Sequence, residues 1–283
     1  MRWLLLLACL AAAPAQAAAQ RIVTLAPHLA ELVCAAGGCD RLVGVARYTD
    51  YPEAAAKVQQ VGDAVAVNLE QVLALKPDLV LVWDGGTAPD TIRRLRGLGL
   101  NVEGIKVQKL TEVADALWRL GDLMQTRRAA ATAVNRYYQQ LDLLRNRHRN
   151  SAAVRVFYQI ERSPMYTISA RSPISEVIEL CGGRNVFADL PQIAGAVSSE
   201  AVLAANPDAV VFARQDGDAA IRAQWARWPD TRAQKLGNLY AIDGDLVARQ
   251  SPRLLDGAQQ LCEALEAARV KLGTASVAQP LLD

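Results

Sequence analysis

The chain contains 283 residues, 52% of them hydrophobic and 21% charged, and its formal net charge is +2. This length is sufficient for one large domain or two of medium size. Because the basic residues are spread along the chain and no basic patch is interleaved with aromatic residues, the sequence gives no support for nucleic-acid binding.

The N-terminus has the organisation of a secretory signal peptide. The charged segment Met1–Trp3 precedes a short apolar run, residues 4–13, and small residues with A-x-A cleavage sites follow. We expect cleavage after Ala17 or Ala19 and assign residues 1–19 to the signal peptide. The apolar run is too short to span a bilayer. The sequence therefore predicts an exported protein.

A second interpretation of this segment is a lipoprotein signal. Leu6–Cys9 resembles a lipoprotein box, which would make Cys9 the lipidated residue. The apolar stretch before Cys9 is unusually short for such a signal, so we favour cleavage without a lipid anchor.

After the signal peptide, segments typical of strands and helices alternate. The β-branched run at residues 21–25 predicts a strand, and the following helix is expected to end near Ala36, before two glycines. A second strand is predicted at residues 42–46, a helix at 68–75 and a continuous apolar strand at 78–83. Apolar runs of this kind are typical of parallel strands that are buried on both faces.

A long helix is predicted to divide the chain at residues 127–150, which contain no proline or glycine. Apolar side chains recur there at three- and four-residue steps, at Ala131, Val134, Tyr138, Leu141 and Leu144, and the opposite face is polar and strongly basic. We expect a single rigid linker helix between an N-terminal lobe at residues 20–126 and a C-terminal lobe at 151–273, with a loose tail at 274–283.

An internal repeat supports two similar lobes. Residues 70–80 and 200–210 both match E-x-V-L-A-x-x-P-D-x-V, and the two copies lie 130 positions apart, on either side of the predicted linker. An apolar helix that ends at two glycines also recurs, at Gly37–Gly38 and at Gly182–Gly183. Because the spacing is close to half the chain length, the repeat predicts two α/β lobes rather than a solenoid.

The mature chain would retain four cysteines, an even number that suggests disulfides in an exported protein. We favour a bond between Cys181 and Cys262, because both lie in the same half of the chain. A second bond, between Cys34 and Cys39, would close a small loop at a helix end. The alternative is that these cysteines are small buried apolar residues.

Signatures of catalysis are absent from the sequence. It contains no G-x-S-x-G, no P-loop and no H-E-x-x-H motif, so we expect a binding protein rather than an enzyme. The two histidines, His28 and His148, are too few for a free metal-ion site, and no C-x-x-C is present. We expect a solvated position for His148 on the linker helix.

Candidate ligand contacts follow the predicted strands. His28 comes after the first strand and Tyr48 after the second, whereas Trp83 ends the long apolar strand. Ligands of α/β sheets bind at the carboxyl ends of the strands, where aromatic rings can stack on flat molecules. The alternatives are a helix-entry role for His28 and a core position for Trp83.

Glu70 and Glu200 occupy equivalent positions in the two copies of the repeat, and each is expected to open a helix. A carboxylate is favourable at a helix N-terminus, which by itself could explain both residues. Their equivalence also predicts two well-separated carboxylates on one edge of the molecule, where they could meet basic pockets of a two-fold symmetric partner.

Short motifs in both halves resemble those of one known family. They are Asp50-Tyr51-Pro52, Asn68-Leu69-Glu70, Trp83 before Gly85-Gly86, Arg155-Val156-Phe157, Cys181-Gly182-Gly183, Val197-Ser198 before Glu200, and Ser251-Pro252-Arg253. The chain is similar, over nearly all of its mature length, to the periplasmic vitamin B12-binding proteins of ABC importers, within the class III (helical-backbone) solute-binding proteins.

The resemblance implies a monomeric periplasmic protein with two Rossmann-like lobes, a rigid linker helix and a corrinoid such as cobalamin in the cleft between the lobes. The positions that match ligand contacts of the family are His28, Tyr48, Trp83, Asp245 and Arg249. Two further pairs match family features. Glu70 and Glu200 correspond to the residues that dock onto an inner-membrane permease dimer with its ATPase, and Cys181 and Cys262 correspond to the family disulfide.

Three positions depart from the family pattern. Ala64 and Ala194 stand roughly where the family has tryptophans that line the cleft, and His28 replaces a small residue. A cleft with fewer indole rings and an added imidazole could hold a corrinoid differently, or His28 could act as an axial ligand to the cobalt or iron of the bound molecule. The alternative function is therefore a haem- or ferric-siderophore-binding protein of the same fold.

Overall fold

The computed structural model describes residues 17–63 and 66–277. The N-terminal lobe is built on a parallel sheet with the strand order β2-β1-β3-β4. Its strands are β1 (Ile22–Thr24), β2 (Leu42–Gly44), β3 (Leu79–Trp83) and β4 (Val102–Ile105). Its helices are α1 (Pro27–Ala35), α2 (Glu53–Ala56), α3 (Leu69–Ala74), α4 (Pro89–Gly97) and α5 (Glu112–Met124), with a short 3-10 helix η1 (Cys39–Arg41).

The C-terminal lobe repeats this plan. Its parallel sheet has the order β11-β10-β5-β8, with β5 (Val154–Gln159), β8 (Gly183–Asn185), β10 (Ala209–Ala213) and β11 (Leu239–Ile242). A small antiparallel sheet contains β6 (Glu161–Arg162), β7 (Met165–Ile168) and β9 (Ala194–Val197). The helices are α7 (Pro173–Leu180), α8 (Ser199–Ala205), α9 (Asp218–Trp225), α10 (Arg232–Lys235), α11 (Gly244–Ala248) and α12 (Leu254–Val277), with the 3-10 helix η2 (Arg214–Asp216).

The sequence repeat forms the same helix–strand unit in both lobes, which confirms the predicted α/β fold class. Asn68 caps α3 and Ser198 caps α8, each through a side-chain oxygen that accepts a backbone N–H of the first turn. The aspartate of each repeat then anchors the first strand of its lobe. Asp78 accepts the N–H of Arg21 at 3.0 Å, and Asp208 accepts the N–H of Arg155 at 2.9 Å.

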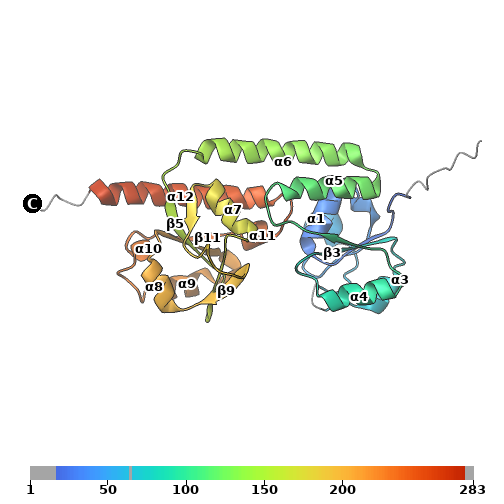
Figure 1. Cartoon of the computed structure of the whole chain (residues 1–283), viewed down its shortest axis with the longest axis horizontal. Coiled ribbons are helices and arrows are strands. Elements are labelled where there is room, and N and C mark those ends of the chain that lie inside the picture. Colours follow the sequence, from blue (N-terminus) through green and yellow to red (C-terminus); the bar gives the residue numbers. More distant parts are fainter. Residues whose placement is uncertain (1–16, 64–65, 278–283) are drawn as a thin grey trace, which may run out of the picture.

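Helix α6 (Arg127–His148) connects the lobes and packs along α5 and α12 (Figure 1). Its buried face carries Val134, Leu141 and Leu144, as predicted. The prediction of buried residues was wrong at two other positions of this helix. Tyr137 rather than Tyr138 faces the core, and Ala130 rather than Ala131 is fully buried. Helix α6 is therefore one layer of a helical backbone shared with α5 and α12.

His148, expected in solvent, is buried instead. Its side chain lies at the end of α6 against α12, where Nδ1 is 2.9 Å from the carboxylate of Glu266. The helix packing explains the difference, because α12 covers the face of α6 on which this residue falls. Helix α12 itself continues to Val277, past the boundary at residue 273 that the sequence suggested.

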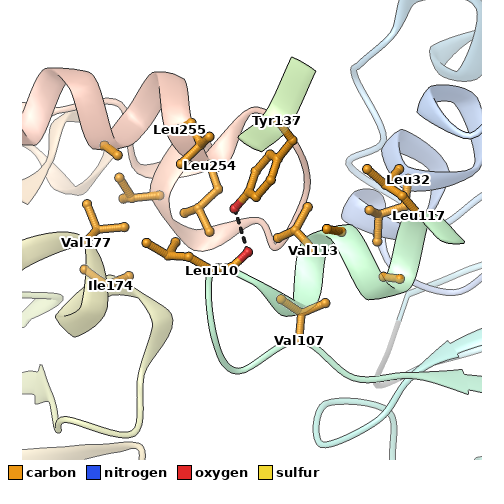
Figure 2. Packing of buried hydrophobic residues seen from close by; sticks show 14 of the residues in the cluster. Leu32, Val107, Leu110, Val113, Leu117, Tyr137, Ile174, Val177, Leu254 and Leu255 are labelled. Carbon is orange, nitrogen blue, oxygen red and sulfur yellow. Dashed lines mark hydrogen bonds between the residues drawn. The ribbon is translucent and has the colours of Figure 1, made fainter. Parts of the chain in front are cut away.

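One hydrophobic core extends through both lobes (Figure 2). Val107, Val113 and Leu117 reach it from the N-terminal lobe, whereas Ile174 and Leu254 reach it from the C-terminal lobe. The linker helix contributes the buried Tyr137 to the same cluster. The Tyr137 hydroxyl donates a hydrogen bond to the carbonyl of Leu110 at 2.9 Å. Because core atoms are close-packed, a shared core of this kind resists independent movement of the two lobes.

The structure contains both predicted disulfides. Cys181, at the end of α7, is bonded to Cys262 on α12, and Cys34, on α1, is bonded to Cys39. The first bond links elements 81 positions apart and the second closes a turn of five positions. Within residues 17–63 and 66–277, no helix is both long enough and apolar enough to cross a membrane.

Candidate functional site

Three of the predicted contact residues lie at one edge of the N-terminal sheet. Strands β2, β1 and β3 are parallel neighbours, so their carboxyl ends meet at the same edge. His28 lies in the first turn of α1 after β1, Tyr48 lies in the loop after β2, and Trp83 ends β3. The sheet therefore brings together residues that are up to 55 positions apart in sequence.

His28 and Trp83 are in direct contact. Their ring centroids are 5.3 Å apart and the planes are nearly perpendicular, at 86°. His28 is only 5% exposed, whereas Trp83 is partly exposed. Burial, together with the nearby positive charge of Arg249, lowers the pKa of His28 to about 3, so the imidazole is neutral at physiological pH.

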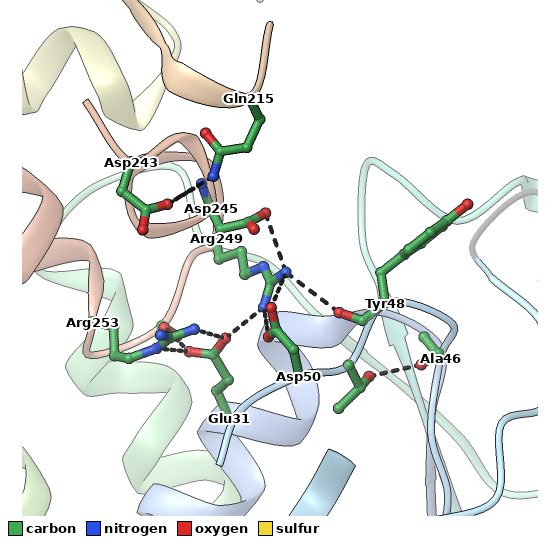
Figure 3. A network of polar contacts seen from close by, with 11 residues as sticks. Glu31, Ala46, Tyr48, Asp50, Gln215, Asp243, Asp245, Arg249 and Arg253 are labelled. Carbon is green, nitrogen blue, oxygen red and sulfur yellow. Dashed lines mark hydrogen bonds and ion pairs between the residues drawn. The ribbon is translucent and has the colours of Figure 1, made fainter. Parts of the chain in front are cut away.

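The C-terminal lobe supplies Asp245 and Arg249, one turn apart on α11 and directly after it (Figure 3). The Arg249 guanidinium is 3.1 Å from the Asp245 carboxylate, and it donates a 3.3 Å hydrogen bond across the lobe boundary to the carbonyl of Tyr48. It also donates to the carboxylate of Asp50. Arg249 thus brings the predicted contacts of the two lobes into one polar cluster.

Asp50 and Tyr51 lie on the loop that carries Tyr48. Burial opposes ionisation of Asp50, but its hydrogen bond to Arg249 and the positive charge of that residue hold the pKa of Asp50 below its ordinary value. The guanidinium of Arg253, which directly precedes α12, stacks over the Tyr51 ring at 4.0 Å from the centroid. Both contacts fasten this loop to the C-terminal lobe.

Sequence reasoning missed Glu31, which is the centre of the polar cluster. This carboxylate is 3% exposed and lies on α1 in the N-terminal lobe. All of its side-chain partners come from the other lobe, with Ser251 Oγ at 2.6 Å, Arg253 Nη2 at 2.9 Å and Arg249 Nη1 at 3.3 Å. The available signal was a single acidic residue in the otherwise apolar segment 29–36.

Glu176 of the C-terminal lobe is the counterpart of Glu31. Each glutamate lies six positions before a Gly-Gly pair, on the first helix of its lobe. Glu176 accepts the backbone N–H of Leu110 at 2.6 Å, and Leu110 belongs to the segment that leads into α5. Glu31 contacts residues 249–253, which lead in the same way into α12. The two lobes therefore exchange equivalent carboxylate contacts.

Glu70 and Glu200 are exposed in the first turns of α3 and α8. Both helices lie on the side of the molecule opposite α6 (Figure 1). The backbone N–H of Glu200 itself and the Ser198 hydroxyl donate hydrogen bonds to the Glu200 carboxylate, and these contacts hold the pKa of its carboxyl below the ordinary value. The helix N-terminus thus accounts for the ionisation of Glu200, as the simpler interpretation expects, and both side chains remain accessible.

The other predicted departures are placed differently. Ala194 is exposed at the start of β9, and Ala64 lies outside the described residues. A cavity of about 680 Å³ lies between the end of α1, the linker helix and the start of α12. Its wall includes Cys34 and Ala133, and also Glu31, Tyr51 and Arg253 of the polar cluster. The cavity therefore adjoins the loop that carries Tyr48, although neither Tyr48 nor Trp83 lines it.

The sequence model of a protein family described as periplasmic binding protein matches residues 22–246 of this chain. The chain belongs to the periplasmic binding protein family. It is 36% identical over 259 residues to the vitamin B12-binding protein of Yersinia pestis (strain Pestoides F), covering 91% of this chain and 90% of that protein. The family resemblance seen in the sequence is thereby confirmed.

Two solved structures are also similar. The periplasmic vitamin B12 binding protein BtuF of Vibrio cholerae matches with a TM-score of 0.83 and 33% identity, over 89% of this chain and 98% of that chain. A periplasmic haem binding protein from Pseudomonas aeruginosa matches with a TM-score of 0.76 and 30% identity, over 87% and 92%. All three relatives are binding proteins by name.

Replacing Glu31 with Gln should destabilise the protein. The substitution leaves the Arg253 cation without its carboxylate partner in a partly buried position. We expect a loss of about 2–4 kcal/mol in the free energy of unfolding, because removing one member of a buried ion pair leaves an uncompensated charge. Urea denaturation at neutral pH measures the change.

The matched control is Glu53→Gln. Glu53 contacts Lys57 through an ion pair that is exposed on both sides, so its loss should change the same free energy by less than about 0.5 kcal/mol. If Glu31→Gln behaves like this control, Glu31 does not hold the lobes together.

Proposed function

We propose that this protein binds cobalamin or a closely related corrinoid in the periplasm and delivers it to an ABC importer. The observation that carries the proposal is the 36% identity to a vitamin B12-binding protein over about nine tenths of both chains. The match to BtuF, with a TM-score of 0.83, extends the likeness to the arrangement of the two lobes. Membership of a periplasmic binding protein family supports the location.

The strand-end residues supply suitable chemistry for a flat, amide-rich ligand. Trp83 and Tyr48 offer aromatic surface at the edge of the N-terminal sheet, and Tyr48 is 68% exposed. Asp245 is half exposed beside Arg249 and offers a hydrogen-bond acceptor from the other lobe. Aromatic rings for apolar area and a few polar groups for orientation are the usual composition of a small-molecule site.

The haem alternative rests on the 30% identity to the Pseudomonas aeruginosa haem binding protein and on His28. The identity is lower than for the vitamin B12-binding protein of Yersinia pestis. His28 is also almost fully covered, with its ring packed on Trp83 instead of presented at the surface. Both observations favour a corrinoid over haem.

The proposal also covers export, through the N-terminal signal peptide, and docking to the importer, through Glu70 and Glu200. Residues 1–19 would be removed on export, without lipidation at Cys9, to leave a monomeric carrier that has no catalytic role. Glu70 and Glu200 would each contact one half of a two-fold symmetric permease that works with an ATPase. Their exposure, their equivalent places in the repeat and their position opposite α6 support this role.

Titration of the mature protein with cyanocobalamin tests the binding proposal. We expect a dissociation constant of about 1 μM or lower by isothermal calorimetry. Trp83→Ala should weaken binding at least about tenfold because it removes the indole at the strand edge. The matched control Trp118→Ala removes an indole that is 39% exposed on α5 and should leave the constant unchanged. Absence of both measurable heat and quenching of tryptophan fluorescence with the unaltered protein would rule out cobalamin as the cargo.

Charge reversal tests the docking proposal. The double variant Glu70→Arg/Glu200→Arg should lose binding to the reconstituted permease complex and keep its cobalamin affinity, because both side chains lie away from the strand-end residues. Asp115→Arg/Glu263→Arg, which reverses one exposed charge per lobe on α5 and α12, is the control and should still dock. Equal loss of docking in both variants would show that the net charge of the protein, and not Glu70 and Glu200 in particular, governs the interaction.

A further inference from the structure

His28 has no part in the proposed chemistry, although it is a buried polar residue beside the candidate site. Its imidazole is 5% exposed. The ring makes a perpendicular contact with Trp83, at 5.3 Å between centroids. The contact with an aromatic ring is therefore the clearest interaction that this side chain makes.

Trp83 is confined from a second direction by Gly86. A Cβ atom built on Gly86 would lie 1.9 Å from Cε3 of the indole, which is far inside a van der Waals contact. The backbone at this glycine is therefore directly against the ring, and no larger residue fits there without moving it. Thr87 adds a third constraint, because its hydroxyl accepts the backbone N–H of Trp83 at 3.1 Å.

The charge state of His28 suits a packing role. Burial disfavours an imidazolium, and the positive charge of Arg249 disfavours it further, so the pKa of His28 falls to about 3. A neutral ring can pack its edge or face on an indole without a desolvated charge. Ligation of cobalt or iron in the ligand would instead need a ring nitrogen directed at the metal, whereas the contact that this imidazole makes is with the Trp83 ring.

We propose that His28 is a positioning residue that holds the Trp83 indole against Gly86, so that one fixed face of the indole meets the ligand. This inference rests on the proposed binding of a corrinoid. In this proposal the imidazole shapes the binding site and does not coordinate the cobalt. The departure from the small residue expected at position 28 then changes how rigidly Trp83 is held.

Two substitutions of His28 separate packing from ligation. Phenylalanine keeps a planar ring against Trp83 but has no nitrogen, whereas alanine removes the ring. We expect His28→Ala to weaken cyanocobalamin binding by about three- to tenfold, the range for loss of one aromatic pair, and His28→Phe to stay within about threefold of the unaltered protein. Gly86→Ala should weaken binding as well, because its methyl group would displace the indole.

Fluorine magnetic resonance of the ligand-free protein complements the titration. In protein labelled with 5-fluorotryptophan, the Trp83 resonance, assigned through Trp83→Phe, should shift or broaden in His28→Ala and return toward its original position in His28→Phe. An unchanged resonance in His28→Ala would overturn the positioning role. The resonances of Trp225 and Trp228, which pack on each other in the C-terminal lobe, should stay unchanged and report that the variants are folded.

The absorbance spectrum of bound aquocobalamin decides whether His28 coordinates the metal. We expect the same spectrum with the unaltered protein and with His28→Phe. A spectrum typical of an imidazole adduct that disappears in His28→Phe, with binding as weak as in His28→Ala, would overturn the proposal in favour of ligation. If the unaltered protein binds no cobalamin, the proposed function fails, while the fluorine spectrum still decides whether His28 positions Trp83.

Discussion

The structure depends on a buried carboxylate of one lobe that is neutralised by the other. Glu31 is 3% exposed, and its partners Arg249, Ser251 and Arg253 all belong to the C-terminal lobe. An isolated buried charge is costly, so separation of the lobes would leave Glu31 and Arg253 either unpaired or newly solvated. Glu176 makes the corresponding contact in the opposite direction. Together with the common hydrophobic core, these contacts fix how the two sheet edges face each other.

The same contacts organise the candidate site. Arg249 links Glu31 to Asp50, to Asp245 and to the carbonyl of Tyr48, so a residue predicted as a ligand contact also joins the lobes. Only 10% of the Arg249 side chain is exposed, which leaves Asp245, Tyr48 and Trp83 as the more accessible groups. A preformed arrangement of this kind suits a rigid, flat cargo, because binding then requires little ordering of the protein.

Much of this organisation could be predicted from the sequence because it depends on local patterns. The repeat identified two α/β lobes, and its aspartates Asp78 and Asp208 have the same role, since each anchors the first strand of its lobe. Strand order could not be predicted, nor could the partners of Glu31, which lie 218 to 222 positions away. A helix occupies the predicted segment, but its helical phase was wrong at Tyr137 because both faces carry tyrosine or alanine. The burial of His148 depends on α12, which packs there only in the folded chain.

The distance between the lobes tests the central claim most directly. Spin labels at Arg93 on α4 and at Arg227 after α9, both exposed and in different lobes, report that distance by pulsed electron resonance. We predict one narrow distribution that shifts by less than about 2 Å when cobalamin is added, and a broader one in Glu31→Gln. Two well-separated populations without ligand, or a shift of more than about 5 Å on binding, would contradict the view that the buried carboxylates hold the lobes in one fixed arrangement.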